Sequence, residues 1–361
     1  MISVIADDFT GAAELAGISL RYGLKVELCV DKVEYKNADV LIVSTDSRSL
    51  NKDEAVTVTG RMLEQIIQLK PEWIYKKIDS VLRGYVLDEL KDQMRLMDKT
   101  RAFIMPANPL LVRTIENGEY FINGIKINET DFVDDPEFPI KTASVRELLN
   151  NEVEVIRWKN KLPATGLLVG EVSKFEDYSY WIDKINEETV LAGAGDFYNA
   201  LLSKYYQPKP QEQFEMQTPH LYVCGTAFKE RKELIKKLDC VAYLPDVIST
   251  EWFKKAGDII RKQQKAVIAI DESTEQASVL RNKMANAIKQ IIERESVNEI
   301  FIEGGSTAAA VLTELNITFL EPVNELERGV VRMKAGDLFI TVKPGSYALP
   351  KEIKRLYRLD K

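Results

Sequence analysis

The first residues in the sequence whose types suggest chemistry are two adjacent carboxylates. Asp7 and Asp8 directly follow the apolar run ISVIA, and Thr10 and Gly11 then suit a tight loop and the start of a helix. Two carboxylates at such a position can accept a proton, bind a polyol or hold a metal ion. One capping Asp would be ordinary. The second carboxylate therefore favours a catalytic role for the pair, with Asp8 also a candidate substrate ligand.

A cluster of cations lies at the end of a second apolar run, EWIYKK, and in the residues directly after it. The cluster contains Lys76, Lys77 and Arg83; Lys77 supplies a point charge, and Arg83 can grip a carboxylate through two parallel hydrogen bonds. Asp79, which lies between them, can bind substrate hydroxyls. The alternative is a surface patch of salt bridges. Ligands of an open parallel sheet bind beyond the carboxyl ends of its strands, so the position after a strand favours an anion-binding site.

Gly-Ser/Thr turns end three apolar runs in the C-terminal half. Glycine lets a backbone approach a ligand closely, and amides at a helix N-terminus bind phosphate. The turns match neither a Walker A loop nor a GxGxxG fingerprint, so each alone is a weak signal. Residues 192–196 are either a fourth such loop or a site of tight packing. Together the turns predict a nucleotide pocket built from backbone amides, with the candidate residues Thr226, Gly304, Gly305, Ser306, Thr307 and Gly345.

Regular elements must position these residues, and the sequence alternates strand-like with helix-like segments. Short β-branched runs such as DVLIVS and RAFIMP lie between helical patterns, which is typical of βαβ units on a parallel sheet. Near-continuous apolar strands indicate that helices cover both sheet faces. A chain of 361 residues is also too long for one ordinary core. We therefore predict an α/β fold with two domains, each with a mainly parallel sheet flanked by helices.

Two segments interrupt this alternation. Residues 206–219, YQPKPQEQFEMQTP, have little apolar content and mark a domain boundary. The expected organisation is a domain at 1–206, a linker at 207–219 and a second domain at 220–361. Residues 106–142 form an insertion in the first domain, in which ENGEYFINGIKI is typical of a hairpin with Asn-Gly turns. An insertion of this length predicts a functional segment or a lid.

Composition argues against several classes of partner. The net charge of −7 and the lack of a long basic run disfavour nucleic acid. No apolar run approaches the length of a membrane span and the N-terminus has no signal-peptide pattern, so a cytoplasmic protein without a membrane partner is expected. A homo-oligomer remains open. Cys29, Cys224 and Cys240 are expected to be buried and reduced, and His220 to lie at the surface.

These motifs, in this order, resemble the four-carbon acid sugar kinase family over essentially the whole chain. The family's ADDLTGA is matched by ADDFTGA at residues 6–12, and its K-x-DSTLRGN by KIDSVLRGY at 77–85. Its PANP-x-x-x-RT segment and DP-x-x-P element are matched within residues 106–139. The glycine turns correspond to the family's GS turn, GG[D/E]TA loop and K-S-G-x-x-G end, with Ser306 where the family usually has an acidic residue.

The resemblance implies that the N-terminal domain binds a sugar acid such as threonate, erythronate or an oxo-tetronate, and that the C-terminal domain binds ATP. The γ-phosphoryl group would pass to the terminal hydroxyl of the acid, with magnesium bridging the phosphates. No protein ligand of the metal is predicted. With the residues that the family motifs add, the expected substrate-binding set is Asp8, Lys77, Asp79, Ser80, Arg83 and Arg113.

Two other functions are alternatives to the kinase. The first is a catalytically silent sensor of sugar acids and nucleotides, and Ser306 in place of the usual acidic residue is its best support. The second is a dinucleotide-dependent oxidoreductase, because both domains are expected to be α/β. No GxGxxG follows a predicted strand, which disfavours the oxidoreductase.

Overall fold

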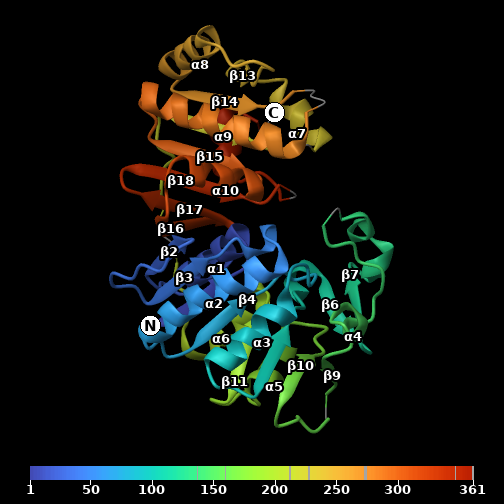
Figure 1. The fold of residues 1–361 in the computed structure, drawn as a ribbon. Helices are drawn as coiled ribbons and strands as arrows, with labels where there is room; N and C mark the ends of the chain where they lie inside the picture. Colours follow the sequence, from blue (N-terminus) through green and yellow to red (C-terminus); the bar gives the residue numbers. More distant parts are fainter. Residues whose placement is uncertain are drawn as a thin grey trace. The chain divides into compact units, whose positions relative to one another are not determined.

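The chain forms two compact units, Met1–Lys209 and Pro210–Lys361. Figure 1 shows that each unit has a β-sheet flanked by α-helices. The predicted α/β fold with mainly parallel sheets is confirmed. The computed structural model describes residues 1–135, 137–158, 160–210, 213–226, 228–271, 275–345 and 347–359.

The N-terminal unit has a parallel sheet in which the strand order reverses between β1 and β4. Its main elements are β1 (Ile2–Ala6), α1 (Phe9–Arg21), β2 (Val26–Val30), β3 (Val40–Ser44), α2 (Lys52–Gln68), β4 (Ile74–Lys77), α3 (Val86–Leu96), β5 (Arg101–Met105), α4 (Val145–Leu148), β9 (Glu154–Ile156), β10 (Gly166–Gly170), α5 (Asp177–Ile182), β11 (Thr189–Gly193) and α6 (Gly195–Tyr205). The strand order is β2-β3-β1-β4-β11-β5-β10-β9. Such a reversal opens a crevice beyond the carboxyl ends of the strands.

The sequence explains why these segments adopt their structures. The apolar runs of β1 and β3 are buried along their whole length, as near-continuous hydrophobic strands predict. Right-handed crossovers that leave β1 and β3 in opposite directions place α1 and α2 on opposite sheet faces. α1 begins where the Asp8 carboxylate accepts a hydrogen bond from the Gly11 backbone N–H at 3.0 Å. One of the two candidate catalytic carboxylates is thus also a helix cap.

The predicted hairpin in the insertion is confirmed, and a third short strand extends it. Asn117 and Gly118 have φ of 52° and 78°, as a tight hairpin turn with an Asn-Gly pair requires. Tyr120, which is fully buried, donates its hydroxyl to the Ser80 backbone oxygen at 2.5 Å and so ties the insertion to the loop after β4. The strands are β6 (Arg113–Glu116), β7 (Glu119–Ile122) and β8 (Ile125–Lys126).

The sheet of the C-terminal unit is parallel on one side and antiparallel on the other. Its elements are β12 (His220–Cys224), α7 (Lys229–Ile235), β13 (Val241–Tyr243), α8 (Thr250–Gln263), β14 (Lys265–Ala269), α9 (Ala277–Arg294), β15 (Glu299–Glu303), α10 (Gly305–Glu314), β16 (Phe319–Glu327), β17 (Val330–Ala335), β18 (Leu338–Lys343) and α11 (Lys351–Tyr357). The order is β13-β14-β12-β15-β18-β17-β16, with a reversal between β12 and β15. β17 pairs with β18 in antiparallel orientation. β16 was not predicted because Pro322 within it argues against a strand.

The prediction that His220 lies at the surface was wrong, because the side chain is fully buried. His220 begins β12, which β14 and β15 flank on both sides. Its Nδ1 hydrogen bonds with the hydroxyl of Tyr357 at 2.9 Å, and Tyr357 belongs to α11, a helix that the sequence analysis did not predict. Burial, followed by Arg332 and Lys265, lowers the pKa of His220 to about 3. The imidazole is therefore neutral and serves as packing.

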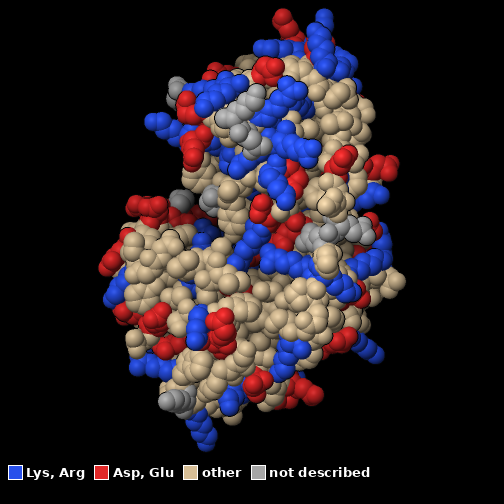
Figure 2. All heavy atoms as spheres, turned by 180° about the vertical axis from the view of Figure 1, so that it is seen from behind, with Lys and Arg blue, Asp and Glu red and all other residues tan. Residues whose placement is uncertain are grey.

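The expected state of the cysteines is confirmed, since Cys29, Cys224 and Cys240 are all buried and free. Among the helices in the described part of the chain, none is long and apolar enough to cross a membrane. Figure 2 shows Lys and Arg side chains interspersed with Asp and Glu over the face that it draws. This mixture reflects the composition, in which 49 basic residues stand against 56 acidic ones.

Limited proteolysis is expected to cut the chain first between residues 206 and 219. The described residues of this stretch form neither helix nor strand, and most of them are exposed. A protease can therefore extend the backbone there at little cost in stability. Mass spectrometry of the first fragments checks the site. Early cleavage inside a central strand such as β1 or β12 would contradict the division into two units.

Candidate functional site

Arg48 lies at the centre of a partly buried ionic cluster in the N-terminal unit. Its Nη2 is 2.9 Å from both carboxylate oxygens of Asp7, and its Nε is 3.0 Å from Oδ2. Nη2 also lies 3.3 Å from the Asp8 carboxylate, and Nη1 lies 3.8 Å from that of Asp79. The aspartates follow β1 and β4, and Arg48 follows β3. The pairing of β1 with both neighbours therefore brings these side chains together.

Arg83 forms the second arm of the cluster. Its Nε and Nη2 donate to the two carboxylate oxygens of Asp79 at 2.8 and 3.2 Å. Its Nη1 donates to Asp135 of the insertion at 3.0 Å. Within the described part of the chain, three of the five guanidinium N–H groups are used in this way. Two N–H groups are left for a ligand.

Lys77 and Arg113 complete the predicted set of substrate-binding residues. The Nζ of Lys77 lies 3.7 Å from the Glu14 carboxylate. Arg113 donates to the hydroxyl of Ser80, and its Cζ lies 5.9 Å from the centroid of the Phe132 ring. The structure thus brings every predicted substrate-binding residue into one cluster beyond the ends of β1 and β4.

Lys76, which the sequence groups with these cations, lies on the other face of the sheet. Successive side chains of a strand point to opposite faces. Lys76 pairs there with Glu89 of α3, and both side chains are almost completely buried. Of the two adjacent lysines, only Lys77 faces the aspartates.

Arg48 controls the protonation of the three aspartates. Burial raises the pKa of Asp7, and Arg48 offsets this effect only in part. Burial also acts on Asp8 and Asp79. Arg48 and Lys77 outweigh it at Asp8, and Arg48 and Arg83 outweigh it at Asp79, so both pKa values lie below their usual range. Asp8 and Asp79 are therefore ionised at neutral pH and can accept hydrogen bonds from the hydroxyls of a ligand.

Arg48 and Asp46 were not predicted as site residues, although both follow a predicted strand. The run DVLIVS is followed by TDSRS, so a search beyond the end of that strand contained the signal. Asp135 was missed for a different reason. It belongs to the insertion, and no local pattern indicates that this segment folds back onto the loop after β4.

In the C-terminal unit, glycine-containing loops follow the adjacent strands β12, β15 and β18. The Gly225 N–H donates to the Glu303 backbone oxygen at 3.0 Å, which continues the strand pairing into the loops. A Cβ on Gly345 would lie 3.3 Å from the Thr226 hydroxyl. The predicted nucleotide-binding residues of the three loops therefore lie together beyond the strand ends.

The start of α10 presents backbone amides beside these loops. Gly304 precedes the helix with φ of 113°, a conformation that residues with a Cβ rarely adopt. Gly305 begins the helix, Ser306 is exposed and Thr307 is buried. A Cβ on Gly225 would overlap the Thr307 hydroxyl, so a larger residue there would push the two loops apart. The first-turn amides have no acceptor within the helix and are suited to a phosphate.

A cavity of about 230 Å³ adjoins these loops. Asp271, which follows β14, also borders it and was not singled out in the sequence. Ala227 and Ser346, which belong to the glycine-turn motifs, lie outside the described residues. The lining combines hydroxyls of the loops with apolar side chains of α9: Thr226, Ser306, Thr307, Ala277, Leu280 and Met284.

The structure favours the packing alternative for residues 192–196. A Cβ on Gly193 would lie 2.6 Å from the Met105 backbone oxygen. A Cβ on Gly195 would overlap the Glu14 carboxylate. The space beside both glycines is thus filled by protein atoms.

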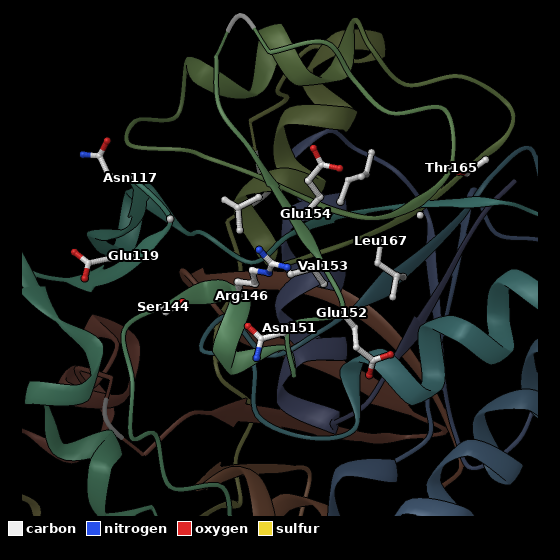
Figure 3. A pocket seen from close by; sticks show the side chains of 14 residues that line it. Asn117, Glu119, Ser144, Arg146, Asn151, Glu152, Val153, Glu154, Thr165 and Leu167 are labelled. Carbon is white, nitrogen blue, oxygen red and sulfur yellow. The ribbon is translucent and has the colours of Figure 1, made fainter.

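An open hollow also lies beside β9 and β10 of the N-terminal sheet (Figure 3). Arg146, Asn151, Glu152 and Glu154 are among the side chains around it, and all four are exposed. The Arg48 cluster differs, because burial and charged partners hold its side chains in fixed positions. A fixed arrangement is what a site for a polyhydroxy acid requires.

Two family models match the chain in order. A sugar-binding N-terminal domain matches residues 2–167, and a nucleotide-binding C-terminal domain matches residues 249–347. The chain belongs to the four-carbon acid sugar kinase family. Its Arg48 cluster lies in the unit that contains the sugar-binding match, and its glycine loops lie in the unit that contains the nucleotide-binding match.

Individual members of the four-carbon acid sugar kinase family are similar over most of the chain. A D-threonate kinase of Salmonella typhimurium is 23% identical, with 85% of each chain covered. A 3-oxo-tetronate kinase of Haemophilus influenzae is 23% identical, with 96% of this chain and 97% of the relative covered. The crystal structure of a Haemophilus influenzae protein superposes with a TM-score of 0.79 at 16% identity, over 99% of this chain and 98% of the other. The last comparison shows a common fold.

Replacing Asp46 by Asn is expected to stabilise the protein at neutral pH. Burial, and then the carboxylates of Asp31 and Asp8, raise the pKa of Asp46 to about 6 against the opposing effect of a Ser49 hydrogen bond. An Asp whose pKa is about 3.9 when unfolded costs stability above its folded pKa, where the folded protein must hold the ionised form. We expect Asp46→Asn to raise the free energy of unfolding by about 1–2 kcal/mol at pH 7, with the gain fading as the pH falls from about 6 to about 4.

Urea unfolding at pH 7 and pH 4 measures this difference. Asp337→Asn, at an exposed position, is the matched control and should change stability little at either pH. An Asp46→Asn gain of the same size at both pH values would show that its cause is not the titration of this carboxyl.

Proposed function

We propose that this protein is an ATP-dependent kinase that phosphorylates the terminal hydroxyl of a four-carbon sugar acid. The observation that carries the proposal is the buried Arg48 cluster at the strand-order reversal between β1 and β4. It combines ionised aspartates, which accept hydrogen bonds from hydroxyls, with cations that attract a carboxylate. Relatives named D-threonate, D-erythronate and 3-oxo-tetronate kinase support the same class of acceptor.

In this proposal Arg83 recognises the carboxylate of the acid through its two remaining N–H groups. Lys77 adds a point charge, and Asp79, already ionised, accepts hydrogen bonds from the hydroxyls. Ser80 and Arg113 border the acid from the loop after β4 and from the insertion. The neutral ring of Phe132 lies against both guanidinium groups, 5.5 Å from Arg83, and limits the space on that side.

The pair Asp7 and Asp8 supplies the carboxylate that receives the proton of the acceptor hydroxyl. Asp8 is the member that reaches the acid, because its side chain is 20% exposed and that of Asp7 is 6% exposed. Asp7 is held on both oxygens by Arg48 and fixes the position of that guanidinium. Phosphoryl transfer through a loose transition state depends more on such positioning than on a strong base.

The C-terminal unit binds ATP, with the phosphates on the amides of the glycine loops and the adenosine in the adjoining cavity. The residues assigned to this role are Thr226, Gly304, Gly305, Ser306, Thr307 and Gly345. Among the described residues, no group of three His, Cys, Asp or Glu side chains is arranged to hold a metal ion. Magnesium, which neutralises phosphate charge when bound, is accordingly assigned to the nucleotide, with few ligands from the protein.

Release of ADP over a panel of threonates, erythronates and oxo-tetronates tests the proposed activity. At least one acid should produce ADP above the background hydrolysis of ATP, because an acceptor hydroxyl held in line replaces water as the nucleophile. A protein that binds both an acid and ATP but forms no ADP with any of them would instead be a sensor. Ser306 in place of the family's usual acidic residue is the observation that favours that second candidate.

Replacing Arg83 by Lys is expected to weaken the binding of the acid and to leave the binding of ATP almost unchanged. The lysine keeps the positive charge but loses the paired N–H groups that match the two oxygens of a carboxylate. We expect the affinity for the acid to fall about tenfold or more, as the loss of one charge-assisted hydrogen bond predicts, and that for ATP to stay within about twofold. Separate calorimetric titrations of acid and ATP measure both effects.

The matched control is Arg95→Lys on α3, where the side chain is 68% exposed and pairs with Asp92 at the surface. It should leave both affinities unchanged. Equal weakening of acid and ATP by Arg83→Lys would assign Arg83 a structural or phosphate-binding role. Unchanged acid binding would remove it from the acid site.

A further inference from the structure

We infer that Lys343 and Glu303 form a buried clamp that shapes the glycine loop after β18 for a nucleotide phosphate. The inference rests on the proposed binding of ATP to the C-terminal unit. Lys343 ends β18 and Glu303 ends the neighbouring strand β15, and both side chains are completely buried. Their charged groups lie 2.9 Å apart.

The ammonium group of Lys343 points into the loop that follows it. Its Nζ lies 2.6 Å from the backbone oxygen of Pro344, 3.2 Å from that of Gly345 and 2.6 Å from that of Tyr347. An ammonium group has three N–H donors. With Glu303 as a fourth acceptor, all of them are directed at protein atoms, so Lys343 acts by positioning the loop and not by contacting the phosphate.

The direction of these carbonyls determines the direction of the amides. In a trans peptide the N–H points opposite to the carbonyl oxygen of the same unit. The Pro344 and Tyr347 oxygens turn inward to Lys343, so the N–H groups of Gly345 and Ala348 turn outward. Within the described part of the chain these two N–H groups have no acceptor. Outward backbone N–H groups beside a glycine turn can donate hydrogen bonds to a bound anion.

Glu303 connects the clamp to the other loops of the proposed phosphate site. Its carboxylate also accepts hydrogen bonds from Arg231 Nε at 3.0 Å and from the hydroxyl of Tyr222. It directly precedes Gly304 at the start of α10, and its backbone oxygen accepts from Gly225. One buried carboxylate therefore fixes the ends of β12, β15 and β18 relative to one another.

The test compares ligands that share adenosine and differ in phosphate. Calorimetry measures the binding of adenosine, ADP and ATP to the full-length protein and to Lys343→Met, which removes the charge and keeps the approximate length of the side chain. We expect the affinities for ADP and ATP to fall about tenfold or more, with adenosine within about twofold, because only the phosphates contact the loop amides. Equal losses for all three ligands would overturn the clamp.

Two further variants separate positioning from stability. Lys343→Arg keeps the charge, but its planar fork does not match three converging carbonyls, so it should show the same selective loss. The double variant Lys343→Met/Glu303→Gln also removes the charge of Glu303, whose carboxylate keeps Arg231 and Tyr222 as partners when Lys343 is replaced, and it should not regain affinity for ATP. Recovery of that affinity in the double variant would show that the charge left on Glu303, and not the loop, caused the loss.

The matched control is Lys76→Met, which breaks a second buried Lys–Glu pair, in the N-terminal unit. It should lower stability and leave the ratio of ATP to adenosine affinity unchanged. A change in that ratio equal to that of Lys343→Met would overturn the clamp, because it would show a general effect of breaking a buried ion pair. If the unaltered protein binds none of the three ligands, the proposed nucleotide function itself fails, whatever the variants show.

Discussion

The register of parallel strand pairing is the constraint on which both functional regions depend. Ala6 at the end of β1 is level with Ser44 at the end of β3 and with Lys77 at the end of β4. The last residues of β12, β15 and β18 are level in the same way. Side chains from distant parts of the sequence therefore share one edge of each sheet. A shift of the register by one residue would turn the side chains of a strand to the opposite face. The residues of the Arg48 cluster, or those of the Lys343–Glu303 clamp, would then no longer meet.

The Arg48 cluster and the Lys343–Glu303 clamp both contain buried charged groups, and the two regions pair these groups with different partners. Around Arg48, one guanidinium serves Asp7, Asp8 and Asp79, so the carboxylates stay close to one another with their oxygens directed at a shared cation. Around Lys343, the ammonium group donates hydrogen bonds to backbone carbonyls. The first arrangement keeps charged side chains near solvent, where a ligand can meet them. The Lys343 arrangement buries its charges and exposes neutral backbone amides, which suit a phosphate that carries its own metal ion.

The fold and most of the candidate site follow from rules that read the sequence locally. Apolar runs predicted the strands, and the positions directly after them contained Asp7, Asp79 and the glycine turns. The features that were not predicted depend on contacts between distant segments of the chain. His220 is buried because a C-terminal helix covers the start of β12, and Asp135 meets Arg83 because the insertion folds back. Lys76 and Lys77 are chemically alike in sequence, and only the pleat of β4 assigns them to different faces.

The insertion between β5 and α4 has a consequence for how this protein can diverge. Asp135 and Phe132 contact Arg83 of the proposed acid site, yet they belong to a segment outside the main sheet, tied to it by contacts such as the Tyr120 hydroxyl. Substitutions there alter the wall facing the acceptor while the strand registers and the Arg48 cluster stay as they are. With the proposed acid site, selectivity among acids of similar length is separable from the scaffold, because one peripheral segment carries part of that site.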